Sequence, residues 1–169
     1  MMYGITGTPG TGKSVVGIEL SRRGYAVIHL TDTVKPYVIG DDEARDTRLI
    51  DVDRWAAEFV PVDGFVEGHF AHLLPCDRII VLRCRPDVLK SRLGSREYKE
   101  GKIRENVEAE ALDSCLIETA ENFRPDQIFE LDTTSRDTVS CADMIEQFIQ
   151  GKIPPGFGTL DWSGFLEVY

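Results

Sequence analysis

The chain has 169 residues, of which 42% are hydrophobic and 28% charged, and its formal net charge is −10. This length suits one domain that buries about 70% of the surface of the unfolded chain, and no apolar stretch approaches the roughly 18 to 20 residues of a membrane span. The acidic balance argues against a broad nucleic-acid-binding surface, because such a surface must be rich in Lys and Arg.

The cysteine usage indicates the compartment. Cys76, Cys84, Cys115 and Cys141 are scattered along the chain without a C-x-x-C pair, which favours reduced thiols in a cytoplasmic protein. A glycine-rich loop already begins at Gly7, so we expect no secretory leader.

The first predicted elements are a strand over residues 3–6 and a helix over residues 14–22. Between them stands the sequence Gly7-Thr8-Pro9-Gly10-Thr11-Gly12-Lys13-Ser14. The pattern G-x-x-x-x-G-K-[ST] between a strand and a helix predicts a phosphate loop, whose N–H groups and helix N-terminus face phosphate oxygens. We expect Lys13 at the β- and γ-phosphates and the Ser14 hydroxyl on Mg²⁺. The alternative is a glycine-rich turn that matches the pattern by chance.

Further apolar runs at residues 25–30, 64–67, 79–82 and 127–131 alternate with helical patterns. This βαβ rhythm predicts an α/β fold with a mainly parallel sheet, helices on both faces and ligands at the carboxyl ends of the strands. The longest helical pattern lies between residues 102 and 123. The last helix is predicted near residues 136–150, and its expected core face is Val139, Ala142, Ile145, Phe148 and Ile149.

We predict one domain over residues 1–151, followed by a tail over residues 152–169. The tail is rich in large apolar side chains such as Trp162 and Phe165. We expect it to wrap over its own domain, because exposed apolar patches are costly; contact with another chain is the alternative.

The predicted strand at residues 64–67 ends in Glu67, and Gly68 and His69 follow. An acid at this position predicts a group that holds Mg²⁺ through water or positions a water molecule. His69 is a candidate to orient water or to donate a hydrogen bond to the γ-phosphate, and otherwise an ordinary loop histidine. The histidines and cysteines do not predict a zinc site, which needs four well-placed ligands.

Basic residues concentrate between positions 83 and 104. They are Arg83, Arg85, Lys90, Arg92, Arg96, Lys99, Lys102 and Arg104. Such a run predicts either a solvated helix face or a clamp for a polyphosphate. Residues 94–102 are polar, contain two glycines and lie between helical patterns, so they predict either a hinged lid with Arg92 and Arg96 beside it or a plain turn. An arginine-bearing lid suits phosphoryl transfer, because it supplies positive charge and excludes water.

These motifs together resemble the small adenylate kinase-like phosphate-loop proteins of archaea and the eukaryotic nucleus. The resemblance covers about residues 3–148. It rests on the phosphate loop, on Glu67-Gly68-His69, on Val81-Leu82-Arg83, and on Arg92-Leu93 followed by Arg96, Tyr98 and Asn106. Members of the family it resembles combine nucleoside monophosphate kinase and ATPase activities and assist maturation of the small ribosomal subunit.

The resemblance implies a P-loop NTPase fold of the nucleoside monophosphate kinase type. It implies a five-stranded parallel sheet with helices around it, a monophosphate-binding segment near residues 31–60 and a lid near residues 94–104. The implied ATP-binding residues are Gly10, Thr11, Gly12, Lys13, Ser14 and Arg96. The implied catalytic residues are Lys13, Glu67, His69, Arg92 and Arg96, with Glu67 and His69 as a Walker B-like pair.

Two positions depart from the pattern of the family that the chain resembles. The acid is commonly Asp there, and Glu67 is one methylene longer, which favours contact with Mg²⁺ through water over direct contact. In the monophosphate segment, Lys35 stands where an arginine is expected, and a lysine lacks the bidentate fork that grips a phosphate. Asp32 and Lys35 are still the residues that we expect near the acceptor.

Three hypotheses follow. The first is an enzyme that moves the γ-phosphoryl of Mg-ATP to AMP or a related nucleoside monophosphate. The second is an ATPase assembly factor whose acidic surface binds a basic ribosomal protein of the small subunit. The third is a small-molecule kinase with a sugar or shikimate-like acceptor, which would share the loop and the fold.

Overall fold

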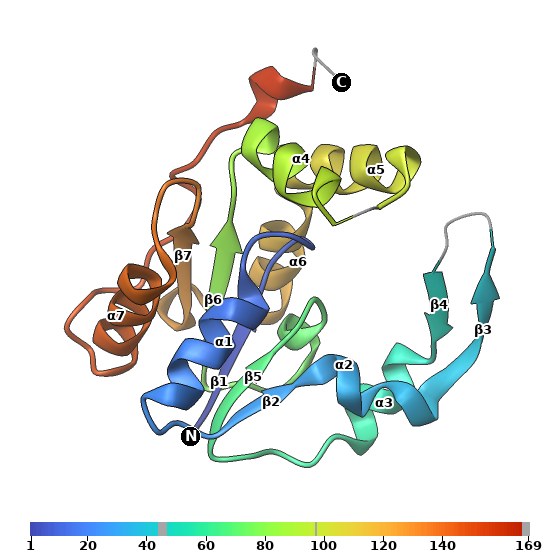
Figure 1. Ribbon diagram of the computed structural model, residues 1–169. Helices are drawn as coiled ribbons and strands as arrows, with labels where there is room; N and C mark the ends of the chain where they lie inside the picture. Colours follow the sequence, from blue (N-terminus) through green and yellow to red (C-terminus); the bar gives the residue numbers. More distant parts are fainter. Residues whose placement is uncertain (44–46, 97, 167–169) are drawn as a thin grey trace.

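A five-stranded parallel sheet in the order β2-β5-β1-β6-β7 forms the centre of the computed structural model, which describes residues 1–43, 47–96 and 98–166 (Figure 1). All neighbouring strands in this sheet run parallel. The strands are β1 (Met2–Thr6), β2 (Val27–His29), β5 (Gly64–Glu67), β6 (Arg78–Arg83) and β7 (Ile128–Asp132). The predicted α/β fold with a five-stranded parallel sheet is confirmed.

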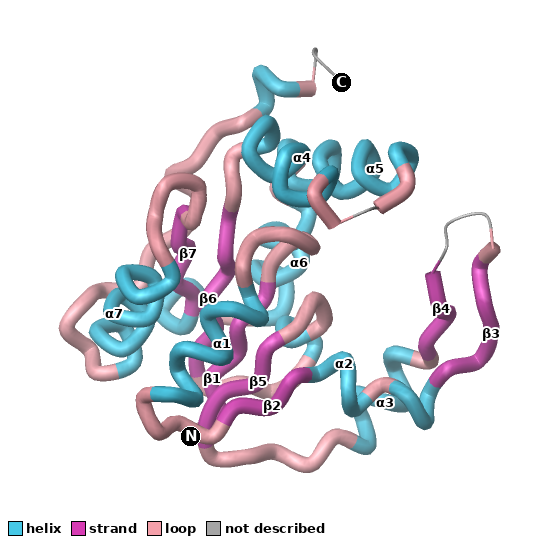
Figure 2. The backbone as a smooth tube through the Cα atoms, in the orientation of Figure 1, coloured by secondary structure: helices cyan, strands magenta, loops and turns pink. Residues whose placement is uncertain are grey.

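Helices cover both faces of the sheet (Figure 2). On one face lie α1 (Lys13–Arg22) and α7 (Thr138–Ile149), and on the other lies α6 (Ser114–Asn122). The other helices are α2 (Leu30–Thr33), α3 (Val52–Glu58), α4 (Pro86–Gly94) and α5 (Glu100–Ala111), with 3-10 turns at Lys35–Tyr37, Ala71–Leu73, Pro125–Gln127 and Ser163–Phe165. None of the helices in the described part of the chain is both long and apolar enough to cross a bilayer.

Strand β6 shows how the core is divided between the two faces. Side chains alternate across a strand, so Ile79 and Val81 pack in the cluster under α6, whereas Ile80 and Leu82 pack in the cluster under α1 and α7. All four are fully buried. A strand that is buried on both faces is an almost continuous apolar run, and for this reason the sequence identified β6 clearly.

Two substructures stand beyond the carboxyl ends of the strands (Figure 1). Helices α4 and α5 pack together through Leu89, Leu93 and Val107. The described residues between positions 31 and 60 form most of α2, a 3-10 turn, the antiparallel pair of β3 (Val38–Asp42) and β4 (Thr47–Ile50), and α3. Lys102 Nζ donates a hydrogen bond to Thr47 Oγ1 at 3.2 Å, so the hairpin contacts α5. The sequence did not predict this hairpin. The monophosphate-binding segment near residues 31–60 and the lid near residues 94–104 stay predictions, and residues 44–46 and 97 of these two segments lie outside the described residues.

Two helix predictions were wrong in detail. The pattern at residues 102–123 is broken at Asp113, which has a left-handed φ of 56° and separates α5 from α6; Asp is one of the few residues that tolerate this conformation, and its carboxylate pairs with Arg83. Val139 is not a core residue, because α7 begins only at Thr138 and the Val139 side chain in its first turn is 53% exposed.

The prediction for the basic run was wrong at Arg83, which belongs neither to a solvated helix face nor to a clamp. Arg83 is the last residue of β6, is 1% exposed and forms ion pairs with Glu110, Glu130 and Asp113. It is buried because the strand continues one residue beyond the apolar run, into a position surrounded by carboxylates.

The described part of the tail lies along β7. Gly156 and Phe129 form a parallel bridge, and Gly156 N donates to the Ile128 carbonyl at 3.0 Å. Further on, Trp162 is 8% exposed and its ring lies 4.8 Å from the Arg83 guanidinium carbon. The tail therefore packs on its own domain, which was the favoured expectation.

Candidate active site

The phosphate loop connects β1 with α1. Gly7, Gly10 and Gly12 have φ angles of 147°, 93° and 106°, which side chains rarely adopt. A Cβ at Gly7 would lie 2.5 Å from the Leu82 carbonyl oxygen, and one at Gly10 would lie 2.8 Å from Leu89 Cδ1. The loop backbone is thus packed directly against β6 and α4, and only glycine fits.

Helix α1 presents its N-terminus to the loop. Its N-cap is Gly12, which has no side chain to cap the first turn, so the N–H groups at the positive end of the helix are left for an anion. This arrangement fits a nucleotide phosphate. The Lys13 side chain folds back to the loop, where Nζ donates to the carbonyls of Gly7 at 2.7 Å and Thr8 at 3.1 Å.

The Lys13 ammonium is poorly solvated beneath the loop. Loss of water around it lowers the pKa of Lys13 to about 8, although Glu67 and Glu110 act in the opposite direction. A phosphate bound beside Lys13 would favour the charged form again, because opposite charges stabilise each other in a partly buried site.

Two cavities flank the loop. The first, of about 140 Å³, is lined by Gly10 and Gly12 on the loop side and by Thr133, Arg136 and Thr138 on the side of α7. The second is about 250 Å³, and the predicted residues that line it are Gly10, Gly12, Lys13, Ser14, Glu67, His69 and Arg96, together with Thr31 and Tyr98. Arg96 lines both cavities. Thr11 is fully buried and lines the first cavity.

Glu67 is held at the bottom of the second cavity. It ends β5, is 4% exposed and contacts His29 Nδ1 on the neighbouring strand β2. Gly17 lets α1 pack closely over this pair, because a Cβ there would lie 3.1 Å from Glu67 Cγ. Sequence reasoning missed His29; its position at the end of the strand beside β5 became visible only with the strand order.

The second cavity suits Mg²⁺ brought in with a nucleotide. The Ser14 hydroxyl and the Glu67 carboxylate line the same space and are the hard oxygen donors that Mg²⁺ prefers. Within the described residues, no three His, Cys, Asp or Glu side chains converge on one point. This donor set fits an ion that takes most of its ligands from phosphate and water.

His69 stands exposed at the mouth of this cavity, with Nδ1 3.2 Å from the Gly7 carbonyl oxygen. Partial desolvation and the nearby Lys13 lower the pKa of His69, so the neutral ring is favoured. Because a carbonyl only accepts, Nδ1 carries the proton in this contact, and Nε2 of the neutral ring is an acceptor. A group of this kind can hold a water molecule or a hydroxyl proton.

Arg92 and Arg96 are placed differently. Arg92 donates to the Thr133 carbonyl at 2.7 Å, to the Thr134 carbonyl at 3.3 Å and to the Gly10 carbonyl at 3.4 Å, so it ties the segment after β7 to the phosphate loop. Arg96 is exposed beside both cavities. Of the two arginines, Arg96 is better placed to neutralise a phosphate.

Asp32 and Lys35 do not line either cavity. They form an exposed ion pair at 3.3 Å, and each side chain is about 70% exposed. Thr31, one residue before Asp32, does reach the second cavity. Sequence reasoning also missed Thr133 and Arg136, although both follow the carboxyl end of β7, the strand end at which ligands bind in this class of fold.

Comparisons with known proteins show the family to which the chain belongs. The model of the AAA domain family matches residues 4–113. A protein of Natronomonas pharaonis named "Putative adenylate kinase" is 38% identical, and the match covers 98% of this chain and 100% of that protein. A protein of the same name from Methanothermobacter thermautotrophicus is 41% identical over 98% of this chain and 99% of its own.

Among solved structures, deoxyadenosine kinase from M. mycoides is similar with a TM-score of 0.62 at 14% sequence identity. The match covers 90% of this chain and 100% of that one. At this level of identity the likeness shows the shared fold.

Proposed function

Because the chain belongs to the AAA domain family and to the family of these archaeal relatives, we propose that it is an adenylate kinase-like enzyme. It moves the γ-phosphoryl group of Mg-ATP to AMP or a related nucleoside monophosphate. The observation that carries this proposal is the pair of cavities on either side of the phosphate loop, which meet at Arg96.

The donor nucleotide occupies the loop and the first cavity. The N–H groups at the start of α1 and the Lys13 ammonium bind its phosphates, and residues 133–138 beside α7 border the base. Arg92 shapes this side by holding Thr133 and Thr134 against the loop. Mg²⁺, when bound with the nucleotide, would be held by Ser14 and, through water, by Glu67, and it would neutralise charge on the transferring group.

The acceptor approaches through the second cavity, from the side of residues 31–60. Thr31 lines that cavity, and Asp32 and Lys35 follow it in the chain as an exposed ion pair. Arg96, at the junction of the two cavities, neutralises charge on the phosphoryl group as it passes between the nucleotides. The lid near residues 94–104, where α4 is followed by α5, excludes water from this step.

A slower hydrolysis of ATP belongs to the same proposal. His69 Nε2 is available as an acceptor at the cavity mouth, and Glu67 is fixed by His29. Together they can orient a water molecule toward the γ-phosphate. Replacement of His69 by Gly should therefore lower hydrolysis more than transfer to AMP, and equal losses in the two assays would count against this role.

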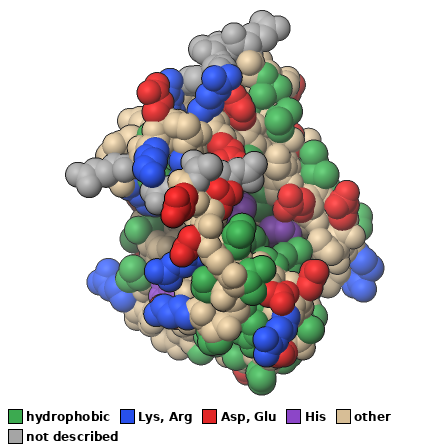
Figure 3. Space-filling view, turned by 90° about the vertical axis from the view of Figure 1, so that its right-hand side faces the viewer, with side chains coloured by type: hydrophobic (Ala, Val, Ile, Leu, Met, Phe, Trp, Pro, Cys, Tyr) green, Lys and Arg blue, Asp and Glu red, His purple; other side chains and the backbone are tan. Residues whose placement is uncertain are grey.

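We also propose, on the resemblance and the net charge of −10, a role in small ribosomal subunit maturation with a basic ribosomal protein as partner, and a cytoplasmic location. The four cysteines are free and buried, which suits a reducing compartment. On the face drawn in Figure 3, acidic and basic side chains are interspersed. The partner surface is therefore tested best by binding of basic small-subunit proteins to the whole chain, and stimulation of ATP hydrolysis by one of them would support it.

The decisive experiment measures ADP formed from Mg-ATP by the purified protein, with and without AMP and the other monophosphates. Chromatography counts transfer and hydrolysis separately. We expect AMP to accelerate turnover and to be consumed, Lys13→Ala to abolish both activities, and Lys152→Ala, a change at an exposed lysine, to leave both intact. Slow hydrolysis that ignores every monophosphate would contradict the kinase.

A further inference from the structure

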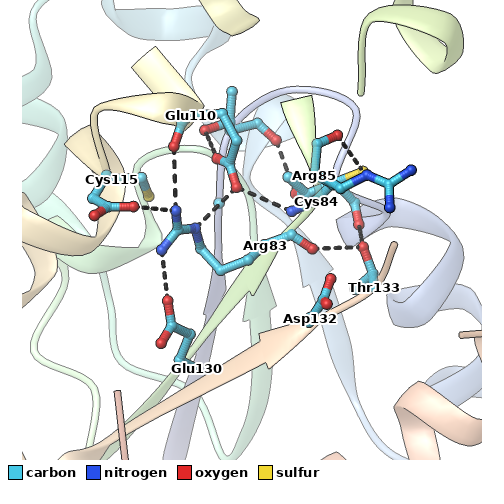
Figure 4. A network of polar contacts seen from close by, with 12 residues as sticks. Arg83, Cys84, Arg85, Glu110, Cys115, Glu130, Asp132 and Thr133 are labelled. Carbon is cyan, nitrogen blue, oxygen red and sulfur yellow. Dashed lines mark hydrogen bonds and ion pairs between the residues drawn. The ribbon is translucent and has the colours of Figure 1, made fainter. Parts of the chain in front are cut away.

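The ion-pair network around Arg83 lies outside the proposed catalytic residues (Figure 4). The Arg83 guanidinium is bonded on three sides: Nε donates to Glu110 Oε1 at 2.9 Å, Nη1 donates to Glu130 Oε1 at 2.5 Å, and Nη2 contacts Asp113. Arg83 and Glu110 are each 1% exposed. Such a buried pair does little for stability compared with an apolar pair of similar volume, so its position in the fold is informative.

Glu110 extends this network to the phosphate loop. Its second oxygen, Oε2, accepts a hydrogen bond from the Thr8 hydroxyl at 2.5 Å, and Oε1 also accepts from the Cys84 backbone N–H at 3.0 Å. One oxygen of the Glu110 carboxylate therefore binds the backbone just after β6, and the other binds the phosphate loop. Thr8 is 2% exposed, so water does not compete for this bond.

Thr8 is hydrogen-bonded to two other residues of the phosphate loop. Its carbonyl accepts hydrogen bonds from Thr11 Oγ1 at 2.8 Å, from Thr11 N at 3.2 Å and from Lys13 Nζ at 3.1 Å. A displacement of Thr8 would move both the loop backbone and the ammonium that binds phosphate. Thr8 thus connects the Glu110 carboxylate to Lys13, the residue proposed to bind the nucleotide phosphates.

The tail contacts this network at Glu130 and Arg83. Glu130 Oε2 accepts from Gly158 N at 2.7 Å and from Thr159 N at 3.2 Å, and the Trp162 ring covers the Arg83 guanidinium. The cation–π contact and these N–H donors shield the guanidinium and the Glu130 carboxylate from water. The whole path runs from the tail through Glu130, Arg83 and Glu110 to Thr8.

We propose that Glu110 is a positioning residue for the phosphate loop, held in place by Arg83 and by the tail that covers Arg83. It acts on ATP binding through Thr8 and does not touch the nucleotide. The role rests on the proposed function for its substrate, because the loop must bind a nucleotide phosphate for its position to matter.

The first test removes only the hydroxyl of Thr8. Thr8→Val keeps the shape of the side chain, and we expect it to weaken Mg-ATP binding about 10-fold, because a hydrogen bond to a buried charged group is lost. Thr8→Ser, which restores a hydroxyl, should return the Kd to within about 3-fold of the wild type. The KM for AMP should change less than the Kd for Mg-ATP in both variants, since Thr8 itself does not line the second cavity.

The matched control is Thr119→Val. Thr119 is fully buried in α6, and its hydroxyl donates to the Cys115 carbonyl at 2.7 Å. This variant loses the same group from a hydrogen bond that involves no residue of the loop, so it should lower the thermal midpoint without changing the Kd for Mg-ATP. A Kd for Thr8→Val equal to that of the wild type, or an equal rise in Thr119→Val, would overturn the proposal.

The second test examines the tail. Trp162→Leu removes the ring over Arg83 and should weaken Mg-ATP binding about 3-fold, whereas Trp162→Phe keeps a ring and should not. Combined with Thr8→Val, Trp162→Leu should have no further effect, because the connection to the loop is already cut. Independent, multiplying effects of the two changes would overturn the role of the tail.

Failure of the proposed function would look different. Phosphoryl transfer to AMP tests the function, whereas the Kd for Mg-ATP and its dependence on the Thr8 hydroxyl test the positioning role. A protein that binds ATP tightly, loses binding in Thr8→Val and transfers nothing to AMP would contradict the function and support the role of Glu110.

Discussion

Replacing Lys13 by Met should abolish ATP-dependent turnover and, at the same time, stabilise the nucleotide-free protein at neutral pH. In the proposed function Lys13 binds the nucleotide phosphates, but without phosphate its ammonium is poorly solvated beside the loop carbonyls. Burial lowers the pKa of Lys13 from 10.5 to about 8. At 1.36 kcal/mol per pKa unit, this shift corresponds to about 3 kcal/mol of destabilisation in the folded state.

Part of that gain is offset in the variant. Met fills the space of the lysine stem but loses the hydrogen bonds to the carbonyls of Gly7 and Thr8, each worth about 1 kcal/mol. The net expectation is a gain of about 1 kcal/mol at pH 7. For a chain of this size, that gain raises the Tm by about 2–4 °C.

The pH dependence gives the sharper test. Below pH 8 Lys13 is protonated in both the folded and the unfolded protein, and the destabilisation is complete. Between about pH 8 and 10.5 the folded protein loses this proton while the unfolded chain keeps it, so the destabilisation fades as the pH rises. The advantage of Lys13→Met should therefore disappear by about pH 9, and at pH 10 the variant should be less stable than the wild type, because the two lost hydrogen bonds then outweigh the remaining destabilisation.

Thermal unfolding followed by circular dichroism, on nucleotide-free protein at pH 7 and pH 10, measures this difference. Lys152→Met, at an exposed position, is the control and should behave like the wild type at both pH values. A Tm of Lys13→Met below that of the wild type at pH 7, or an advantage that is the same at both pH values, would refute the reasoning.

Three further substitutions separate stability from activity. Arg83→Met leaves the Glu110 and Glu130 carboxylates buried without their cation, so the free energy of unfolding measured in urea should fall by about 3–5 kcal/mol. A decrease below about 1 kcal/mol would show that the two carboxylates do not depend on Arg83 for their charge balance. In Arg92→Lys, the lysine cannot donate to the Thr133 and Thr134 carbonyls together. Steady-state kinetics should therefore show a raised KM for ATP and an unchanged KM for AMP. Equal changes in the two KM values would contradict the place of Arg92 on the ATP side of the site. Gly64→Ala forces a side chain onto a φ of 140° and places its Cβ 2.4 Å from the Ala26 carbonyl oxygen. The substitution should therefore lower the Tm clearly, while kcat per folded molecule is retained. A reduced kcat in the folded variant would mean that Gly64 also affects the active site.

The local pattern of the sequence was sufficient for the loop and for much of the sheet. A phosphate loop is encoded in eight consecutive residues, because its glycines and Lys13 act within one turn of backbone. Strands such as β6 are recognisable because burial on both faces demands an unbroken apolar run. Glu67 and His69 could be named from their place at a strand end. The comparisons also bear out the family resemblance that these motifs carried.

Only the tertiary structure decided which distant residues share an environment. His29 contacts Glu67 because β2 lies beside β5, and no local sequence pattern predicts this strand order. Arg83 lies in a basic run that predicted either a solvated helix face or a polyphosphate clamp, yet carboxylates from α5, β7 and the turn at Asp113 surround it. Local patterns record what each segment prefers by itself, whereas the pairing of charges buried in the core depends on contacts between segments far apart in the chain, which exist only after the sheet has assembled.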